Sequence, residues 1–215
     1  MRVYHLLSER YALDDLRGRR LKVSLLADMN DPFELLGGAL KVRAHRRAFN
    51  RFKEGMAKKC GVLCFSRSWS NPVLWSHYAD KHHGVCLGFE VPDKFLTPVS
   101  YQAKRLEMNL ERQLAAGVID DKLGITLLTT KFEDWRYEDE LRMFIKPDEM
   151  AEETGLYFFD FSPELVLKEV VIGVRSNLPL GNVLAAVDAR DRPVQVKKAR
   201  LAFRSFRIIQ NRSVR

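Results

Sequence analysis

The sequence predicts a single α+β domain in which helices flank a mixed, mostly antiparallel sheet. Short runs rich in β-branched and aromatic residues alternate irregularly with amphipathic segments, and late in the chain the gaps between them are of hairpin length. A doubly wound parallel sheet requires regular strand–helix alternation, which this pattern lacks. We place the α+β domain at 1–192 and assign 193–215 to a basic C-terminal strand and tail.

Elements in the first half follow from local signals. The strands are expected at 2–7, 21–24, 61–66 and 84–91, and the helices at 8–17, 43–59 and 71–79. Ser8 can cap the first helix, and Pro72 favours the first turn of the third. The second helix has Ala48, Phe52 and Met56 four residues apart on one face, as an amphipathic helix requires.

The second half predicts more strands than helices. A helix is expected around 104–116, where leucines recur every four residues. The apolar, threonine-containing segment 123–131 fits a helix or a strand, and the sequence alone does not decide between them. Further strands are expected at 137–145, 156–161, 167–174 and 201–209, and a short helix at 180–186.

The composition is that of an ordinary globular protein, since 46% of the 215 residues are hydrophobic and 30% are charged. No apolar run approaches the ~20 residues of a membrane span, and the N-terminus lacks a signal-peptide core. The three cysteines, an odd number, fall between 60 and 86. They favour reduced thiols in a cytoplasmic protein. Membrane, collagen-like, disordered and disulfide-stapled proteins are therefore excluded.

Charge is distributed unevenly along the chain, which has a net charge of +8. The segments 41–59 and 193–215 each contribute +7, whereas 107–164 contributes −9. Such polarity suits an anionic small molecule, or nucleic acid, held near the two basic segments. The alternative interpretation is that 41–59 is a solvated helix face and 193–215 a solvated end.

Paired carboxylates provide the first candidate for catalysis. If 137–145 is a strand, Glu138, Glu140 and Arg142 share one side of it. Two carboxylates two residues apart raise each other's pKa, and a neighbouring arginine restrains that rise. One could orient a sugar hydroxyl while the other takes a proton from a nucleophile. The alternative is a row of ion pairs on a solvated face.

A second candidate region follows the buried strand at 61–66, because binding groups gather in loops after strands. Trp75 and Tyr78 lie three apart on one helix face, where they could wall a flat ring or pack the helix onto the sheet. His5 is either a core histidine or part of the site. The candidate substrate-binding residues are Asn30, Ser66, Arg67, Ser68, Trp75, His77, Tyr78 and Arg142.

Several familiar sites are excluded. Cys60 and Cys64 would lie about 13 Å apart on a strand, too far to share one tetrahedral zinc ion. Cys64 and Cys86 fall inside apolar strands, where cysteine behaves as a small hydrophobic residue. The chain has no P-loop, no dinucleotide-binding glycine motif and no nucleophile elbow. We therefore expect no metal and no resident cofactor.

Four motifs together resemble a known family. They are NDPFE at 30–34, VLWSHYADKHHGVCLGFEV at 73–91, TTKFEDWRYEDELR at 129–142 and EVVIGV at 169–174. In this order, and over nearly the whole chain, they resemble a family of uncharacterised bacterial proteins, domain-of-unknown-function family 2971. That resemblance implies no particular activity.

The chain also resembles ADP-ribosyltransferases more remotely. Those enzymes have a first strand with His or Arg, a strand ending in an aromatic residue and Ser/Thr-x-Ser/Thr, and a late E-x-E strand. The corresponding positions here are His5, 65–68 and 138–140. The resemblance implies that Glu140 bonds the ribose of NAD and stabilises an oxocarbenium-like centre, while Glu138 deprotonates or positions the acceptor. It also implies that His5 holds the adenosine ribose or the nicotinamide amide.

Three functional hypotheses follow. The first is an NAD-consuming, ADP-ribosyltransferase-like enzyme, a toxin or defence effector, that transfers ADP-ribose or hydrolyses NAD. In it Ser66 would support the site, and Trp75 or Tyr78 would stack on nicotinamide. The second is a nucleic-acid-binding module that uses 41–59 and 193–215. The third is a non-catalytic domain that binds a small ligand or a protein.

Overall fold

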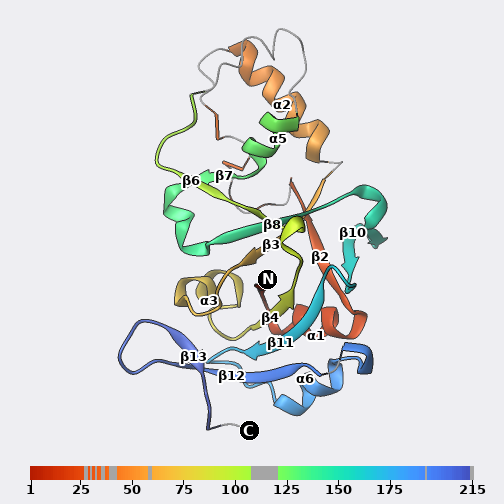
Figure 1. Cartoon of the computed structure of the whole chain (residues 1–215), viewed down its shortest axis with the longest axis vertical. Helices are drawn as coiled ribbons and strands as arrows, with labels where there is room; N and C mark the ends of the chain where they lie inside the picture. The colour runs from red at the N-terminus through yellow and green to blue at the C-terminus, as the bar shows by residue number, and fades with distance from the viewer. Residues whose placement is uncertain are drawn as a thin grey trace.

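One large, mostly antiparallel sheet runs through the molecule and confirms the predicted α+β architecture (Figure 1). The computed structural model that shows it describes residues 1–26, 29, 31, 33, 34, 37, 38, 43–57, 60–107, 121–191 and 193–213. Its strands are β1 (Arg2–Leu7), β2 (Arg20–Leu25), β3 (Gly61–Ser66), β4 (Val85–Glu90), β5 (Thr97–Pro98), β8 (Glu140–Ile145), β9 (Ala151–Glu153), β10 (Leu156–Asp160), β11 (Val166–Ile172), β12 (Gln195–Leu201) and β13 (Ile208–Gln210).

Strand order shows how distant segments meet. Neighbouring strands follow the order β13-β12-β11-β4-β1-β3-β2-β10-β9, and β8 pairs with β3 and β5. Within the described residues of this sheet, only β11 and β12 run parallel. The basic C-terminal segment therefore supplies two strands of the main sheet.

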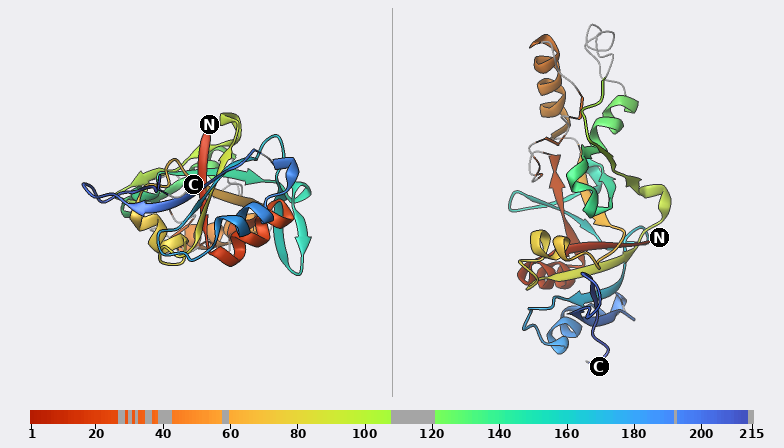
Figure 2. Two further views of the ribbon diagram at one scale, coloured as in Figure 1. Left: turned by 90° about the horizontal axis from the view of Figure 1, so that it is seen from below. Right: turned by 90° about the vertical axis from the view of Figure 1, so that its left-hand side faces the viewer.

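Helices cover both faces of the lower half of the sheet (Figures 1 and 2). Helices α1 (Glu9–Gly18) and α6 (Leu180–Ala186) pack on one face, where Leu16 and Val183 join a core with Leu87 of β4. Helix α3 (Pro72–Tyr78) packs on the other face, where Trp75 contacts a cluster that contains Cys86. This arrangement follows the alternation of side chains along a strand. No helix in the described ranges is long and apolar enough to span a membrane.

The opposite end of the molecule is built from α2 (Arg43–Ala57), α5 (Asp121–Leu128) and a separate parallel pair of strands, β6 (Ser100–Gln102) and β7 (Thr130–Phe132). Phe49 of α2 and Leu127 of α5 form a core cluster with Val62 of β3. This cluster joins the helical end to the sheet.

The sheet divides along one edge of β3. The far edge of β3 pairs with β8 along its whole length, from Gly61 to Ser66. On the near edge, among the described residues, β2 pairs only with Val62 and Gly61, and β1 pairs only with Ser66. Strands β1 and β2 therefore separate beside the middle of β3.

Several predicted elements match the structure closely. The bounds of β1, β3 and α6 are those expected from the sequence. Asn71 caps α3, since its side-chain oxygen accepts a hydrogen bond from the Val73 amide at 2.9 Å. Ser8 occupies the N-cap position of α1, but its side chain makes no capping hydrogen bond. The undecided segment 123–131 contains both elements, the end of α5 and the start of β7.

Other predictions were wrong. The expected strand at 137–145 begins three residues late, because η3 (Glu133–Glu138) is a 3-10 helix. The expected strand at 201–209 is the hairpin between β12 and β13, whose tip exposes 92% of Phe203 and 98% of Phe206. Within the expected helix at 104–116, residues 104–107 are not helical, and 108–116 lie outside the described residues.

Asp15 on α1 makes the stability of the fold dependent on pH. It is only 4% exposed, and burial, aided by the charge of Asp14, raises its pKa from 3.8 to about 7. The folded state therefore binds this proton more tightly, and the contribution to the free energy of unfolding is lost as pH rises from about 4 to about 7. We predict that Asp15→Asn stabilises the protein at pH 8 and leaves it nearly unchanged at pH 4.

Urea denaturation at both pH values measures this effect. Asp14→Asn is the matched control, since it removes the same charge from an exposed neighbour and should give little stabilisation at pH 8. Equal changes in the two variants would contradict the prediction.

Candidate active site

A cavity of about 260 Å³ lies where β1 and β2 separate beside β3. Its walls come from β1, the end of β2, β3, α3, β7 and the turn before β8. Of the residues singled out in the sequence, five line this cavity: His5, Ser66, Tyr78, Glu138 and Glu140. The fold thus brings together segments that are far apart in the chain.

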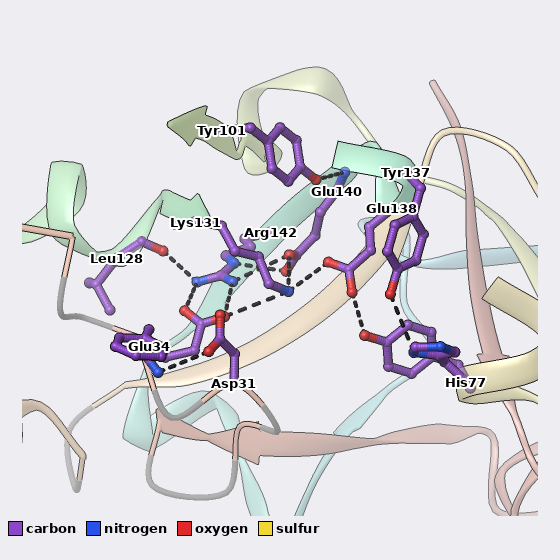
Figure 3. A network of polar contacts seen from close by, with 12 residues as sticks. Asp31, Glu34, His77, Tyr101, Leu128, Lys131, Tyr137, Glu138, Glu140 and Arg142 are labelled. Atoms are coloured by element: carbon purple, nitrogen blue, oxygen red, sulfur yellow. Dashed lines mark hydrogen bonds and ion pairs between the residues drawn. The ribbon is translucent and has the colours of Figure 1, made fainter. Parts of the chain in front are cut away.

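Arg142 is the centre of a buried network beside the cavity (Figure 3). Its side chain is 0% exposed, and its guanidinium donates to both oxygens of Glu34 at 2.7 and 2.9 Å. It also donates to Oε1 of Glu140 at 2.8 Å and to the Leu128 carbonyl at 2.6 Å. These hydrogen bonds, with a further one to Oε2 of Glu140, use all the N–H groups of the guanidinium. Glu140 is therefore held in one orientation.

Lys131 completes the network from β7 (Figure 3). Its buried ammonium donates to Glu138 at 2.6 Å and to Glu140 at 3.2 Å, and lies 3.7 Å from Glu34. The network therefore contains three carboxylates and two cations. When all five groups are ionised, one net negative charge remains next to the cavity.

The two carboxylates that line the cavity differ in pKa. Burial alone would raise the pKa of Glu140, but Arg142 and Lys131 outweigh it and lower that pKa to about 2. For Glu138, burial prevails over the attraction of Lys131, and its pKa is raised above the ordinary 4.5. Glu140 is thus a permanent negative charge, whereas Glu138 is the member able to exchange a proton.

Asp139 explains how both carboxylates reach the same place. Its backbone is left-handed, with φ of 44°, and it separates η3 from β8. The prediction that Glu138 and Glu140 lie on one strand was therefore wrong for Glu138. The alternative of a solvated row of ion pairs is also wrong, because Glu138 and Glu140 are each 5% exposed and Arg142 is 0% exposed.

Two tyrosine hydroxyls, those of Tyr78 and Tyr101, contact the two glutamates, and Figure 3 labels Tyr101 beside the Glu140 amide. The Tyr78 hydroxyl donates to Oε1 of Glu138. The Tyr101 hydroxyl accepts a hydrogen bond from the Glu140 amide at 2.8 Å, and burial raises the pKa of Tyr101 to about 12. The Tyr101 hydroxyl therefore stays protonated at neutral pH.

His5 faces the cavity from the edge of β1. Its Nδ1 lies 2.9 Å from the Cys64 carbonyl. Since a carbonyl can only accept, Nδ1 carries the proton and Nε2 is an acceptor. Burial lowers the pKa of His5, so the ring is neutral at pH 7. The imidazole thus lies beside the middle of β3, where a neighbouring strand would otherwise form a backbone hydrogen bond with Cys64.

The central part of the chain matches one known family model. Residues 74–143 match the family model described as Protein of unknown function (DUF2971). The match confirms the expected resemblance to family 2971 over this part, which we name the DUF2971 segment. The quoted motifs at 30–34 and 169–174 lie outside it. No curated protein and no solved structure matches the chain significantly, and the resemblance to ADP-ribosyltransferases gains no support.

The DUF2971 segment contains most of the network. It includes Tyr78, Tyr101, Lys131, Glu138, Glu140 and Arg142. His5 and Glu34 come from outside it, before residue 74. Strand β1 therefore helps to line the cavity, and Glu34 completes the network beside it.

The structure does not bring every candidate to the cavity. Trp75 lies in the core at 0% exposure, and its indole nitrogen donates to the Trp69 carbonyl at 2.6 Å. His77 is exposed, with Nδ1 3.3 Å from the Tyr137 hydroxyl. Arg142 does not line the cavity but orients Glu140. Asn30 lies outside the described residues.

The serine-rich loop after β3 forms hydrogen bonds among its own residues at the edge of the cavity. Ser66 Oγ donates to the Ser68 carbonyl at 3.0 Å, and Ser68 Oγ lies 2.9 Å from Ser70 Oγ. Arg67 is exposed and pairs with Asp139 at 3.3 Å. Ser66 thus shapes the wall, while Arg67 ties the loop to the turn before β8.

Sequence reasoning missed the roles of Glu34, Tyr101 and Lys131. Glu34 and Lys131 fall within quoted motifs, yet Glu34 and Arg142 are 108 positions apart, and no spacing pattern connects them. Tyr101 acts through its hydroxyl on a backbone amide, which no side-chain pattern reveals. The only available sign was a lone lysine next to an acid-rich stretch.

Neither metal ligands nor reactive thiols occur among the described residues. No group of three or more His, Cys, Asp or Glu side chains there could hold a metal ion. The cysteines are free thiols, and burial raises the pKa of Cys64 and of Cys86 well above 9.0. These two thiols stay protonated and do not act as nucleophiles at neutral pH.

The two basic segments do not form one surface. The described part of 41–59 is α2, at one end of the molecule, and the described part of 193–215 forms β12 and β13 at the other (Figures 1 and 2). A ligand as small as the cavity therefore cannot contact both segments.

We predict that Arg142→Met destabilises the protein by about 3–5 kcal/mol, because it leaves buried carboxylates without their cation. Chemical denaturation at pH 7 measures the change. Arg136→Met is the matched control, since the Arg136 side chain is 61% exposed and its ion pair with Glu133 lies at the surface. The control should change stability by about 0–1 kcal/mol. A comparable loss in both variants would show that the network does not stabilise the fold.

Proposed function

We propose that the protein is an NAD-consuming enzyme that cleaves the bond between nicotinamide and ribose and passes ADP-ribose to a macromolecule or to water. The observation that carries the proposal is that His5, Ser66, Glu138 and Glu140 line one cavity. These are the residues that the resemblance to ADP-ribosyltransferases singles out. Such an enzyme would act as a toxin or defence effector by depleting NAD or modifying a target.

The charge beside the cavity suits this reaction. As the C1′–N bond breaks, its electron pair moves to the pyridinium nitrogen, neutral nicotinamide leaves, and positive charge develops on the ribose. Glu140 supplies a fixed negative charge for that centre, since its pKa is lowered to about 2. A charge that is already oriented in a buried site needs no rearrangement during the reaction.

Glu138 has the properties of the general base. An oxygen nucleophile, water or an acceptor hydroxyl, forms the C1′–O bond and must lose a proton. Burial raises the pKa of Glu138, which makes its carboxylate a better proton acceptor near neutral pH. The Tyr78 hydroxyl and the Lys131 ammonium hold that carboxylate in place.

The size and lining of the cavity suit one half of NAD. At about 260 Å³ it is smaller than the ~300–1,000 Å³ of typical small-molecule sites. It therefore suits nicotinamide and its ribose better than a whole dinucleotide. The nicotinamide carboxamide can donate to Nε2 of His5, and the Tyr78 ring offers an aromatic wall.

We predict that Glu140→Gln lowers the rate of nicotinamide release from NAD by at least about 100-fold, the effect of removing one preorganised electrostatic group. Release is measured by chromatography of free nicotinamide. Glu169→Gln is the matched control, because Glu169 is also a buried, ion-paired carboxylate but does not line the cavity or join the network. It should retain most of the activity.

Thermal unfolding of both variants separates catalysis from folding. An active Glu140→Gln variant, or equal loss of activity in two equally folded variants, would refute the assigned role. Absence of nicotinamide release by the natural protein, tested also with candidate acceptor proteins present, would refute the proposed function.

We predict that kcat falls as pH drops through the raised pKa of Glu138, because the base must be ionised. Tyr78→Phe removes a hydrogen bond that favours the charged form of Glu138, so this acid limb should move to higher pH. Tyr137→Phe is the control, since its hydroxyl contacts His77 and should leave the limb in place. A limb at the same pH in the natural protein and in Tyr78→Phe would contradict Glu138 as the base.

A further inference from the structure

A second cavity, of about 340 Å³, lies beside β6 and β7. Its lining includes Phe33, residues 102–105 and Phe132. None of the described residues that line it is acidic. It is larger than the first cavity and has no assigned role.

The lining combines aromatic rings with cations. Phe33 and Phe132 are 53% and 47% exposed, so both present apolar ring surface to a ligand in this cavity. Lys104 and Arg105 are exposed beside them, and the Arg105 guanidinium lies 5.3 Å from the centre of the Phe33 ring. Rings next to cations, without acids, suit an anionic ligand that carries a flat ring.

Strand β7 separates the two cavities. Lys131 lines both of them, and its ammonium points into the buried network (Figure 3). Thr130 and Phe132, its neighbours on the strand, line only the second cavity, as alternation along a strand requires. Met29 lines the first cavity and Phe33 the second. The two cavities are therefore adjacent.

We infer that the second cavity binds the adenosine diphosphate half of NAD while the first holds the nicotinamide ribose. The inference rests on the proposed function and identifies where the remainder of the substrate lies. Phe33 and Phe132 stack on the adenine, as aromatic side chains do on nucleic-acid bases. Lys104 and Arg105 pair with the diphosphate.

The test measures binding of ADP to the full chain by calorimetry, together with the steady-state kinetics of nicotinamide release from NAD. In the double variant Lys104→Ala/Arg105→Ala, ADP binding should weaken at least about tenfold, as loss of charge-assisted hydrogen bonds predicts. KM for NAD should rise by a similar factor, while kcat stays within about twofold, because no reacting atom is touched.

Matched variants separate charge and stacking. Lys168→Ala/Arg175→Ala removes the same charges from exposed positions on and after β11 and should leave ADP binding unchanged. Phe132→Ala should weaken ADP about tenfold but leave inorganic pyrophosphate unchanged, since only ADP has a base to stack. Phe206→Ala, at the exposed hairpin tip, is its control.

The outcomes distinguish the two proposals. ADP binding that is absent in the natural protein, or unaffected by Lys104→Ala/Arg105→Ala, overturns the second site whether or not NAD is cleaved. ADP binding that requires these residues, in a protein that never releases nicotinamide, supports an ADP-binding cavity and overturns the proposed function. Weaker ADP binding with a higher KM and unchanged kcat supports both.

Discussion

The buried guanidinium of Arg142 is the constraint on which the site depends. A fully desolvated cation is tolerated only when carboxylates lie against it, and Glu34 and Glu140 come from opposite halves of the chain. The Leu128 carbonyl at the end of α5 occupies a further donor. A single side chain therefore fixes a turn, a helix end and a strand relative to one another. The uncompensated negative charge next to the cavity is a consequence of this packing.

The separation of β1 and β2 creates the cavity that lies next to this negative charge. Because β1 and β2 separate beside β3, the Cys64 carbonyl lacks a strand neighbour on that edge and accepts from His5 instead. The His5 imidazole thus supplies the hydrogen bond that the backbone of a neighbouring strand would otherwise supply. The neutral ring leaves one nitrogen for a ligand, so the same feature opens the cavity and equips its wall.

Local signals predicted the elements better than the site. Strands such as β1 and β3 and the helix α6 are specified by their own residues, whereas the hairpin tip at Phe203 and Phe206 resembles a continuous strand because it alternates polar and apolar residues. His5, Ser66 and the two acids were identified from motif order. Glu34 was not, because it contacts Arg142 from 108 positions away, and the sheet topology decides such a contact. Lys131 was not either, because its contact with Glu138 depends on η3, which was expected to be part of a strand.

The left-handed backbone of Asp139 sets the positions of Glu138 and Glu140 relative to each other. A single left-handed residue reverses the path between η3 and β8, so Glu138 belongs to a short helical turn and Glu140 to a strand anchored by β3. Deleting or inserting one position at this joint would rotate the first acid away from the second without disturbing the strand. The spacing of the pair is therefore set by the backbone at Asp139.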